Sequence, residues 1–338
     1  MNPPVNRNTF KVTKGTEARR GNARRVAADI CGQRGARRVS ISAFTRAGSV
    51  HATRLRPFEP AFITVTPPMD QPPPSTSTDP SSLIEVRSCF VRKRNALVTR
   101  GQFGPVFMDY YLHVADHGLR LAESLDGMMK ESLVGMVLHM AAKPWNEEHA
   151  WTVNFHDPRA NFFVTGDNKA STVTGRCFTE NVRVLEQQMF FSQQQKTAMP
   201  LRQSAVEFKG GSFLRSVEQF YAQSEQRPGR FFEHADEDYV FVSAQPQCDE
   251  EWLAGLTDEK IRELDKCEEL SLLETRTYRW ECGCTTDKLY TALLPHAQRD
   301  IDGIFAGQEV LKATCPRCAR RYFIDREQLE AWVVAREV

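Results

Sequence analysis

Two short cysteine pairs near the C-terminal end constrain this chain more than any other feature. The stretch "WECGCTTDKL" holds Cys282 and Cys284, and "KATCPRCARRYF" holds Cys315 and Cys318. Four thiolates held by two such knuckles satisfy a tetrahedral Zn²⁺ on all sides and leave no position open for hydrolytic chemistry. We therefore predict that these four cysteines bind one Zn²⁺ per chain in the reduced protein.

The sequence around the cysteines predicts a small folded module over residues 281–338. A helix is expected directly after Cys284, with Thr285 or Thr286 as its N-cap, and a second short helix near "QRDIDGIFAG". The alternating stretch "EVLKATCPRCARRYFID" predicts a hairpin with Cys315 and Cys318 at its tip. Asp325 should cap a last helix, with Gln328 as its capping-box partner. A piece of this size has little core of its own, so the metal should stabilise it.

Residues 82–245 are predicted to form an α+β domain with a mixed sheet and helices. "IEVRSCFVRKRNALVTRG" is typical of one or two strands, and further strands should meet at a turn at Asp157-Pro158. Helical periodicity runs from Phe107 to Lys143, with expected interruptions at Gly118 and Gly127. The apolar residues predicted to form the core face of these helices are Leu112, Leu119, Leu121, Leu125, Met128, Leu133, Met136, Val137 and Met140.

Residues 246–280 differ from both neighbours because they are strongly acidic and helix-prone. They would join the α+β domain to the cysteine module as a helical linker. A charge-rich helix of this kind is usually a solvated connection, and the sequence by itself does not give it a further role.

The first 80 residues have a composition unlike the rest of the chain. Residues 1–60 contain 13 basic and three acidic residues, and the run "PPMDQPPPSTSTDPSS" cannot build a core. Three interpretations stay open: a disordered extension, an organelle transit peptide, and a misassigned start, with the true start near Met69.

The remaining composition excludes several classes of protein. After residue 60 the chain has 31 basic and 40 acidic residues, which argues against a nucleic-acid partner. No apolar stretch is long enough for a membrane span, and no secretory signal follows Met1. Nine unevenly spread cysteines do not indicate a secreted disulfide framework. We expect a cytoplasmic protein with no membrane partner.

Other residues with chemical potential form no convincing catalytic set. His113 and His117 stand four residues apart on an expected helix, but no acidic third ligand follows at a telling spacing. We interpret them as ordinary surface or core histidines. Nucleophile-elbow, Walker-type and dinucleotide-binding motifs are missing from the sequence, so we do not expect an enzyme.

Two separate stretches resemble the redox-regulated heat-shock holdases of the thirty-three-kilodalton chaperonin family. One is the Cys-x-Cys and Cys-x-x-Cys pattern followed by "RYFID" and "REQLEAW". The other is the helix "SVEQFYAQSEQRP", which contains Ser224, Glu225, Gln226 and Pro228. The similarity covers about residues 82–335 and is strongest from 205 onward.

The resemblance implies an ATP-independent chaperone with an α+β substrate-binding domain, a metastable linker and a zinc redox switch. The reduced, zinc-bound form would be inactive. Oxidation would form Cys282–Cys284 and Cys315–Cys318 disulfides, release zinc and unfold the linker, and the exposed apolar surface would capture unfolding client proteins. Cys177, Cys248 and Cys267 are interpreted as incidental thiols. Whether the oxidised form is a homodimer stays open.

A second class of function competes with this one. The cysteine module could be a zinc ribbon that binds nucleic acid or protein around a purely structural metal. The two hypotheses differ in what oxidation does to the metal, because thiolates that hold zinc are also the groups that oxidants attack.

Overall fold

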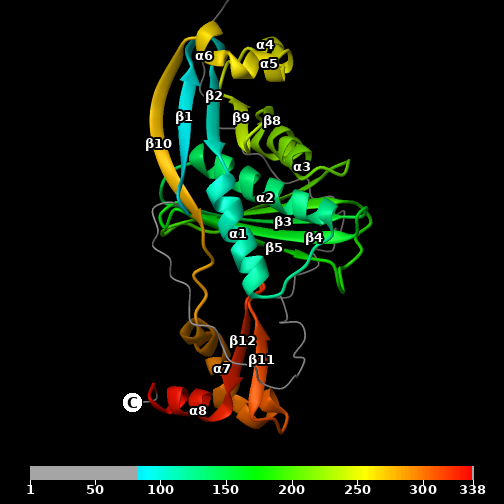
Figure 1. Cartoon of the computed structure of the whole chain (residues 1–338), viewed down its shortest axis with the longest axis vertical. Coiled ribbons are helices and arrows are strands. Elements are labelled where there is room, and N and C mark those ends of the chain that lie inside the picture. Colours follow the sequence, from blue (N-terminus) through cyan, green and yellow to red (C-terminus); the bar gives the residue numbers. More distant parts are fainter. Residues whose placement is uncertain (1–81, 337–338) are drawn as a thin grey trace, which may run out of the picture. The chain divides into compact units, whose positions relative to one another are not determined.

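A computed structural model describes residues 82–336, and these residues belong to one compact unit of the chain (Figure 1). The predicted extension over residues 1–80 lies outside the described residues. Within this described part, no helix is long and apolar enough to cross a membrane.

The core domain is built on a mixed sheet, which confirms the α+β prediction. Its strands follow the spatial order β7-β6-β3-β4-β5-β10-β1-β2-β9-β8, and all neighbours are antiparallel except β5 and β10. The strands span Ile84–Val91 (β1), Ala96–Gln102 (β2), Glu147–Phe155 (β3), Ala160–Asp167 (β4), Thr172–Phe178 (β5), Met189–Lys196 (β6), Arg202–Glu207 (β7), Gly229–His234 (β8), Asp238–Ala244 (β9) and Leu270–Trp280 (β10).

Two consecutive helices pack on one face of this sheet, α1 (Gly104–Asp116) and α2 (Glu123–Ala141). The predicted break at Gly118 is confirmed, because this glycine has φ of 56° and ends the first helix. The predicted break at Gly127 is wrong. This residue lies inside α2, whose following turns bury Met128, Leu133, Met136, Val137 and Met140 and so hold the helix together.

One residue of the predicted core face also needs correction. Leu112 lies on the outer side of α1 and is 55% exposed, while the same helix buries Val106, Phe107 and Tyr110. Positions 106, 107 and 110 follow the three- and four-residue spacing of one helix face, and Leu112 falls outside that face.

The helix expected in "SVEQFYAQSEQRP" belongs to α3 (Phe213–Phe220) and a π-helical turn, η3 (Tyr221–Glu225). Ser212 caps its start by accepting a hydrogen bond from the Arg215 backbone. Gln226 ends it in the left-handed conformation, two residues before Pro228. The expected helix is therefore confirmed.

The helical structure predicted for residues 246–280 is present in the first part of this range and missing from the last. Three short helices follow the core, α4 (Glu250–Ala254), α5 (Asp258–Arg262) and α6 (Leu264–Cys267). Residues 270–280 are not helical, because they form the long strand β10, which pairs with β1. The alternation in "ETRTYRW" explains this difference, since it buries Arg276 and Tyr278 on one face and leaves Thr275 and Thr277 on the other.

The short linker helices cover an apolar face of the sheet formed by β1, β2, β8 and β9, opposite the face that packs on α1 and α2. Helices of four or five residues are not stable alone in water, so these depend on the contacts with the sheet. The buried residues of this second core are Val91, Ala96, Val98, Phe232, Val240, Val242, Ala244, Leu253, Leu256, Ile261 and Leu264.

The module after β10 has the predicted elements. They are α7 (Thr286–Phe305), β11 (Val310–Thr314), β12 (Arg321–Asp325) and α8 (Arg326–Val334). Thr285 and Asp325 are the N-caps, accepting from the Lys288 and Gln328 backbones. The two helices expected between the cysteine pairs are continuous except for a kink at Asp300.

A chain of buried polar side chains joins α2, β3 and η3 inside the core domain. His139 Nδ1 lies 2.6 Å from the Tyr221 hydroxyl, and His139 Nε2 lies 3.2 Å from His149 Nδ1. His149 Nε2 lies 3.5 Å from a carboxylate oxygen of Glu147. With both imidazoles neutral, Tyr221 donates to His139, His139 to His149, and His149 faces Glu147.

We expect this row of buried side chains to make the core domain sensitive to mild acid. Burial holds the pKa of His139 well below its ordinary value and lowers that of His149 to about 4, with Lys143 opposing protonation of both. Unfolded histidine binds its proton near pH ~6.5. The lowered pKa values belong to the folded state, so the stability of the core domain is not reduced by these histidines above about pH 6.5. It falls as the pH drops from 6.5 toward 4, by about 3 kcal/mol for His149.

Urea unfolding followed by tryptophan fluorescence between pH 7 and 4.5 measures this loss. The double variant His139→Gln/His149→Gln should show a shallower pH dependence, while His296→Gln, at an exposed site on α7, should keep the original slope. An unchanged slope in the double variant would contradict the assignment.

Candidate metal centre

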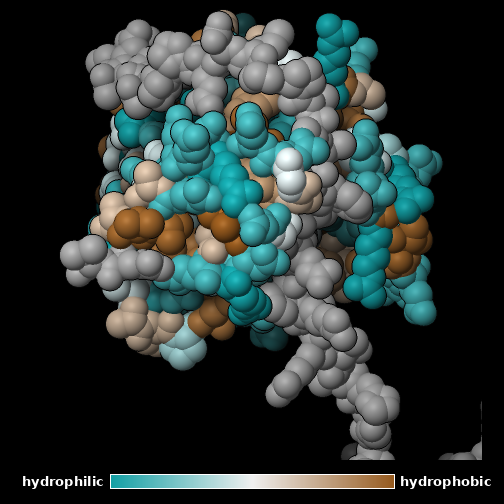
Figure 2. Space-filling view, turned by 90° about the horizontal axis from the view of Figure 1, so that it is seen from below, coloured by the Kyte–Doolittle hydropathy of each residue, from teal (hydrophilic) through white to brown (hydrophobic). Residues whose placement is uncertain are grey.

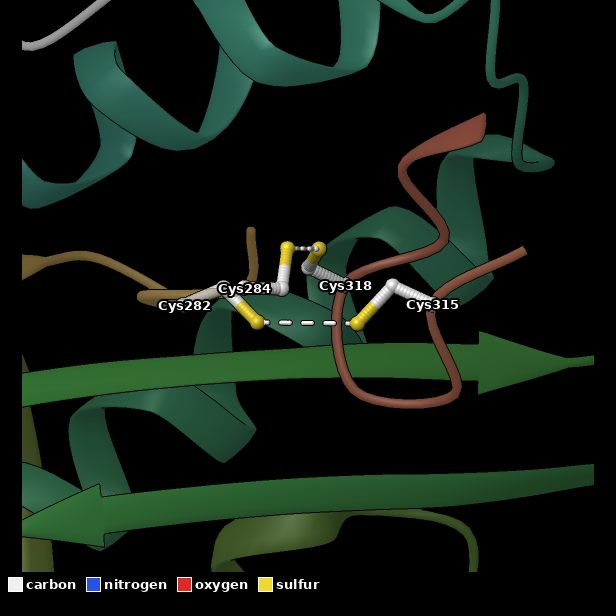
Figure 3. A group of neighbouring side chains, drawn as sticks. All are labelled: Cys282, Cys284, Cys315 and Cys318. Carbon is white, nitrogen blue, oxygen red and sulfur yellow. Dashed lines mark hydrogen bonds between the residues drawn. The ribbon is translucent and has the colours of Figure 1, made fainter. Parts of the chain in front are cut away.

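The four cysteines singled out by the sequence come together at one place. The sulfur atoms of Cys282, Cys284, Cys315 and Cys318 all lie within 4.8 Å of one another. Figure 3 shows them pointing toward a common centre, with Cys282 and Cys315 Sγ 3.7 Å apart and Cys284 and Cys318 Sγ 3.6 Å apart. Among the described residues this is the one group of three or more potential metal ligands found.

The one-residue spacer of the first pair works because the spacer is a glycine. Gly283 has φ of 61°, in the left-handed region, which reverses the chain between Cys282 and Cys284. Both thiols thereby turn to the same side. The Lys288 ammonium donates to the Gly283 carbonyl at 2.6 Å and fixes this turn to the start of α7.

The second pair lies in the tight turn between β11 and β12. The Cys315 backbone N–H donates to the Arg320 carbonyl, and the Ala319 N–H donates to the Cys315 carbonyl. Ala319 itself has φ of 65°. From β12, the Tyr322 hydroxyl donates to Cys284 Sγ at 3.0 Å, so this strand contributes a direct contact to the first pair.

The chemistry of the four thiols fits a cation. Hydrogen bonding from Cys282, with further help from Cys318 and Tyr322, lowers the pKa of Cys284 to about 7. Hydrogen bonding with Cys282, Cys284 and Cys315 raises the pKa of Cys318. Thiols this close cannot all ionise unless a positive charge joins them. Four sulfur donors and this preference suit a Zn²⁺ ion, which is tetrahedral with thiolates.

Three contacts from the core domain reach this centre, and the sequence had not indicated them. His113 Nε2 lies 2.7 Å from the Cys318 carbonyl, and the Arg176 guanidinium donates to the Cys315 carbonyl at 3.2 Å. In the opposite direction, Arg317 donates to the Thr165 hydroxyl at 2.9 Å. Burial lowers the pKa of Arg176, and charge on Cys315 and Cys318 opposes that change.

Only one of these contacts had a detectable signal in the sequence. His113 was visible as half of the His113–His117 pair, which was interpreted as ordinary surface or core histidines. The structure puts both imidazoles beside the module but outside the group of potential ligands, with their ring centroids 4.5 Å apart. Arg176 and Thr165 belong to strands whose neighbours in space no local pattern could reveal.

The three cysteines interpreted from the sequence as incidental thiols lie outside this group of four. Cys177 and Cys248 are partly buried, and Cys267 is exposed at the end of α6. Burial raises the pKa of Cys177 to about 12 and also raises that of Cys248, which keeps both as unreactive thiols at neutral pH.

Comparison with protein families gives a match over the linker and the cysteines. The model of the family described as "Hsp33 protein" matches residues 233–325. The 33 kDa chaperonin of Caldanaerobacter subterraneus subsp. tengcongensis is 30% identical over 63 residues, or 19% of this chain and 21% of the relative. The 33 kDa chaperonin of Bacillus subtilis is 32% identical over 76 residues, or 22% of this chain and 26% of the relative. The matched part thus spans about a quarter of the length of these relatives or less.

The fold has a wider counterpart among solved structures. The crystal structure of the 33 kDa chaperonin (heat shock protein 33 homologue) of Thermotoga maritima aligns with a TM-score of 0.56 over 75% of this chain and 98% of that chain. Sequence identity over this alignment is 15%, so this likeness concerns the fold.

Proposed function

Because the family model, the curated relatives and the solved fold support the 33 kDa chaperonin family for this chain, we propose that it is a redox-regulated holdase of the cytoplasm. In this proposal it is no enzyme, and it binds unfolding client proteins without ATP. The convergence of four thiols directly after the strand that leaves the linker supports the proposal most.

In the reduced form, Cys282, Cys284, Cys315 and Cys318 would hold one Zn²⁺. The bound ion supplies a positive charge that keeps the four thiolates together and stabilises the module. The two pairs would be oxidised by two molecules of peroxide. Four thiolates lose four electrons to form two disulfides, and the peroxide takes up these electrons and four protons to give four waters. With its ligands consumed, the metal would leave.

The apolar face beneath α4–α6 is the surface we propose for clients. Release of the linker would uncover the sheet side of the second core, which contains Phe232, Val240 and Val242. A groove of about 500 Å³ already runs beside it, between β1, β2 and β9 and the linker residues Ile261 and Leu264. Figure 2 shows the opposite end of the molecule, where apolar residues occur in small groups between hydrophilic ones.

The strand β10 provides a physical route from the cysteines to the linker. It joins α6 to Cys282, and its last residue, Trp280, packs against both the main core and the cysteine group. Loss of order in the module would therefore loosen the end of β10, and the three short helices before it have little stability to resist.

We expect peroxide at heat-shock temperature to release zinc from the reduced protein and to switch on the suppression of client aggregation. Zinc release is measured with a chromophoric chelator and aggregation by light scattering of a thermally unfolded client. The competing function, a zinc ribbon with an inert structural metal, predicts retained zinc. If the reduced form protects clients as well as the oxidised form does, this result would also contradict the proposed switch.

The disulfide pairing provides a second readout of the same experiment. The sulfur contacts of the reduced form join Cys282 to Cys315 and Cys284 to Cys318. The proposed product instead has Cys282–Cys284 and Cys315–Cys318 bonds. These local pairs leave the two halves of the module free to separate, whereas cross-pairs would tie them together. Peptide mapping of the oxidised protein distinguishes the two, and cross-pairs would contradict module unfolding.

A further inference from the structure

Two side chains of the core domain contact backbone carbonyls of the turn that contains Cys315 and Cys318. The Cys315 carbonyl accepts from Arg176 of β5, and the Cys318 carbonyl is contacted by His113 of α1. A carbonyl only accepts hydrogen bonds, so Nε2 of His113 carries the proton. Each residue of the second pair is therefore held by a different element of the core.

His113 also reaches the first pair. Its ring lies 4.4 Å, between centroids, from the ring of Trp280, which is two residues before Cys282. Among the described residues, His113 thus contacts chain segments that lead into both cysteine pairs. A change in the spacing of the two pairs would disturb one of its two contacts.

Arg176 brings a positive charge to a site whose charge depends on its chemical state. Four thiolates around one divalent cation carry a net charge of −2, while two disulfides without metal carry none. The guanidinium is partly buried and lies 4.3 Å above the ring of Phe178. Charge interactions are stronger in such a partly water-excluded position than at an open surface. On the module's own side, Arg317, Arg320 and Lys288 also carry positive charge.

We propose that Arg176 and His113 form a latch, which means that they hold the module docked on the core domain only while the cysteine site is negatively charged. This inference rests on the proposed redox function. In the reduced, metal-bound state, the negative site attracts Arg176, and the module stays docked on α1, β4 and β5. Oxidation removes the charge and with it the main attraction, so the module undocks before or as it unfolds. By linkage, docking in turn increases the affinity of the four cysteines for the metal.

Three variants of the full-length, zinc-loaded chain test the latch. Arg176→Gln removes the charge, Arg176→Lys keeps it, and Arg87→Gln is a matched control at an exposed arginine of β1. We expect Arg176→Gln to lose zinc to a chelator at least ten times faster than the original chain, with Arg176→Lys in between and Arg87→Gln unchanged.

Hydrogen exchange of residues 313–320 gives a readout other than metal content. In the unmodified reduced protein, protection of this turn should fall as salt rises from low to molar concentration, because screening weakens the attraction. In Arg176→Gln the protection should be low at all salt concentrations, and in the oxidised protein salt should have no effect. This salt titration needs no variant, so it decides the question even if Arg176→Gln folds poorly.

Zinc loss within twofold of the original chain in Arg176→Gln, or protection that does not respond to salt, would overturn the latch. These outcomes are distinct from failure of the proposed function, in which oxidation leaves zinc bound or does not protect clients. If the protein is a holdase but hydrogen exchange of residues 313–320 does not respond to salt, the proposed function stands and the latch is refuted.

Discussion

Cys315→Ser is expected to reduce bound zinc from one ion per chain to almost none and to unfold much of the module. Cys315 is 3% exposed and touches sulfur on the opposite pair, so a hydroxyl there removes a ligand and leaves a buried polar group without its partner. Metal binding contributes about 10–16 kcal/mol in small zinc modules, and such modules depend on it to fold. The module's own apolar core contains Tyr290, Ala297, Phe305, Leu311, Ile324, Leu329 and Val333.

Metal analysis and hydrogen exchange over residues 281–336 measure the two parts of this result. Limited proteolysis should also cut residues 246–280 faster, if the module holds the linker in place. Cys267→Ser is the matched control, since this exposed thiol lies outside the sulfur group. Unchanged protease resistance of the linker in Cys315→Ser would contradict the coupling between metal and linker.

Glu225→Gln is expected to destabilise the core domain by about 3–5 kcal/mol, because it leaves Lys143 as a buried and uncompensated charge. The Lys143 ammonium lies 2.6 Å from the Glu225 carboxylate, and the two side chains are 11% and 10% exposed. Burial alone would raise the pKa of Glu225, but Lys143, Arg202 and Arg227 together bring it below its ordinary value. The carboxylate is therefore charged at neutral pH.

Urea unfolding of Glu225→Gln, Lys143→Met and the double variant gives the coupling energy between the two groups. The double variant should recover much of the loss, since it buries no lone charge. Glu263→Gln is the matched control, because its ion pair with Lys266 has exposures of 61% and 69% and should contribute about 0–1 kcal/mol. Equal effects of Glu225→Gln and Glu263→Gln would refute the argument.

Local sequence patterns predicted the cysteine module most fully. Thr285 and Asp325 cap helices where expected, and the alternation around Cys315 and Cys318 forms the hairpin. Such features depend on residues within a few positions of one another, so a single sequence contains the whole signal. The same local logic misjudged residues 270–280, where acidic composition suggested a helix but alternation and pairing with β1 produced a strand.

The sequence by itself determined the α+β class and the four sulfur residues that form the centre. The structure adds that Gly283 is left-handed, which lets one residue separate two ligands. Only the tertiary structure decided that β10 joins the main sheet and that His113 and Arg176 reach the Cys318 and Cys315 carbonyls. These contacts join residues 139 to 205 positions apart, and no periodicity records which distant surfaces meet when the apolar faces are buried together.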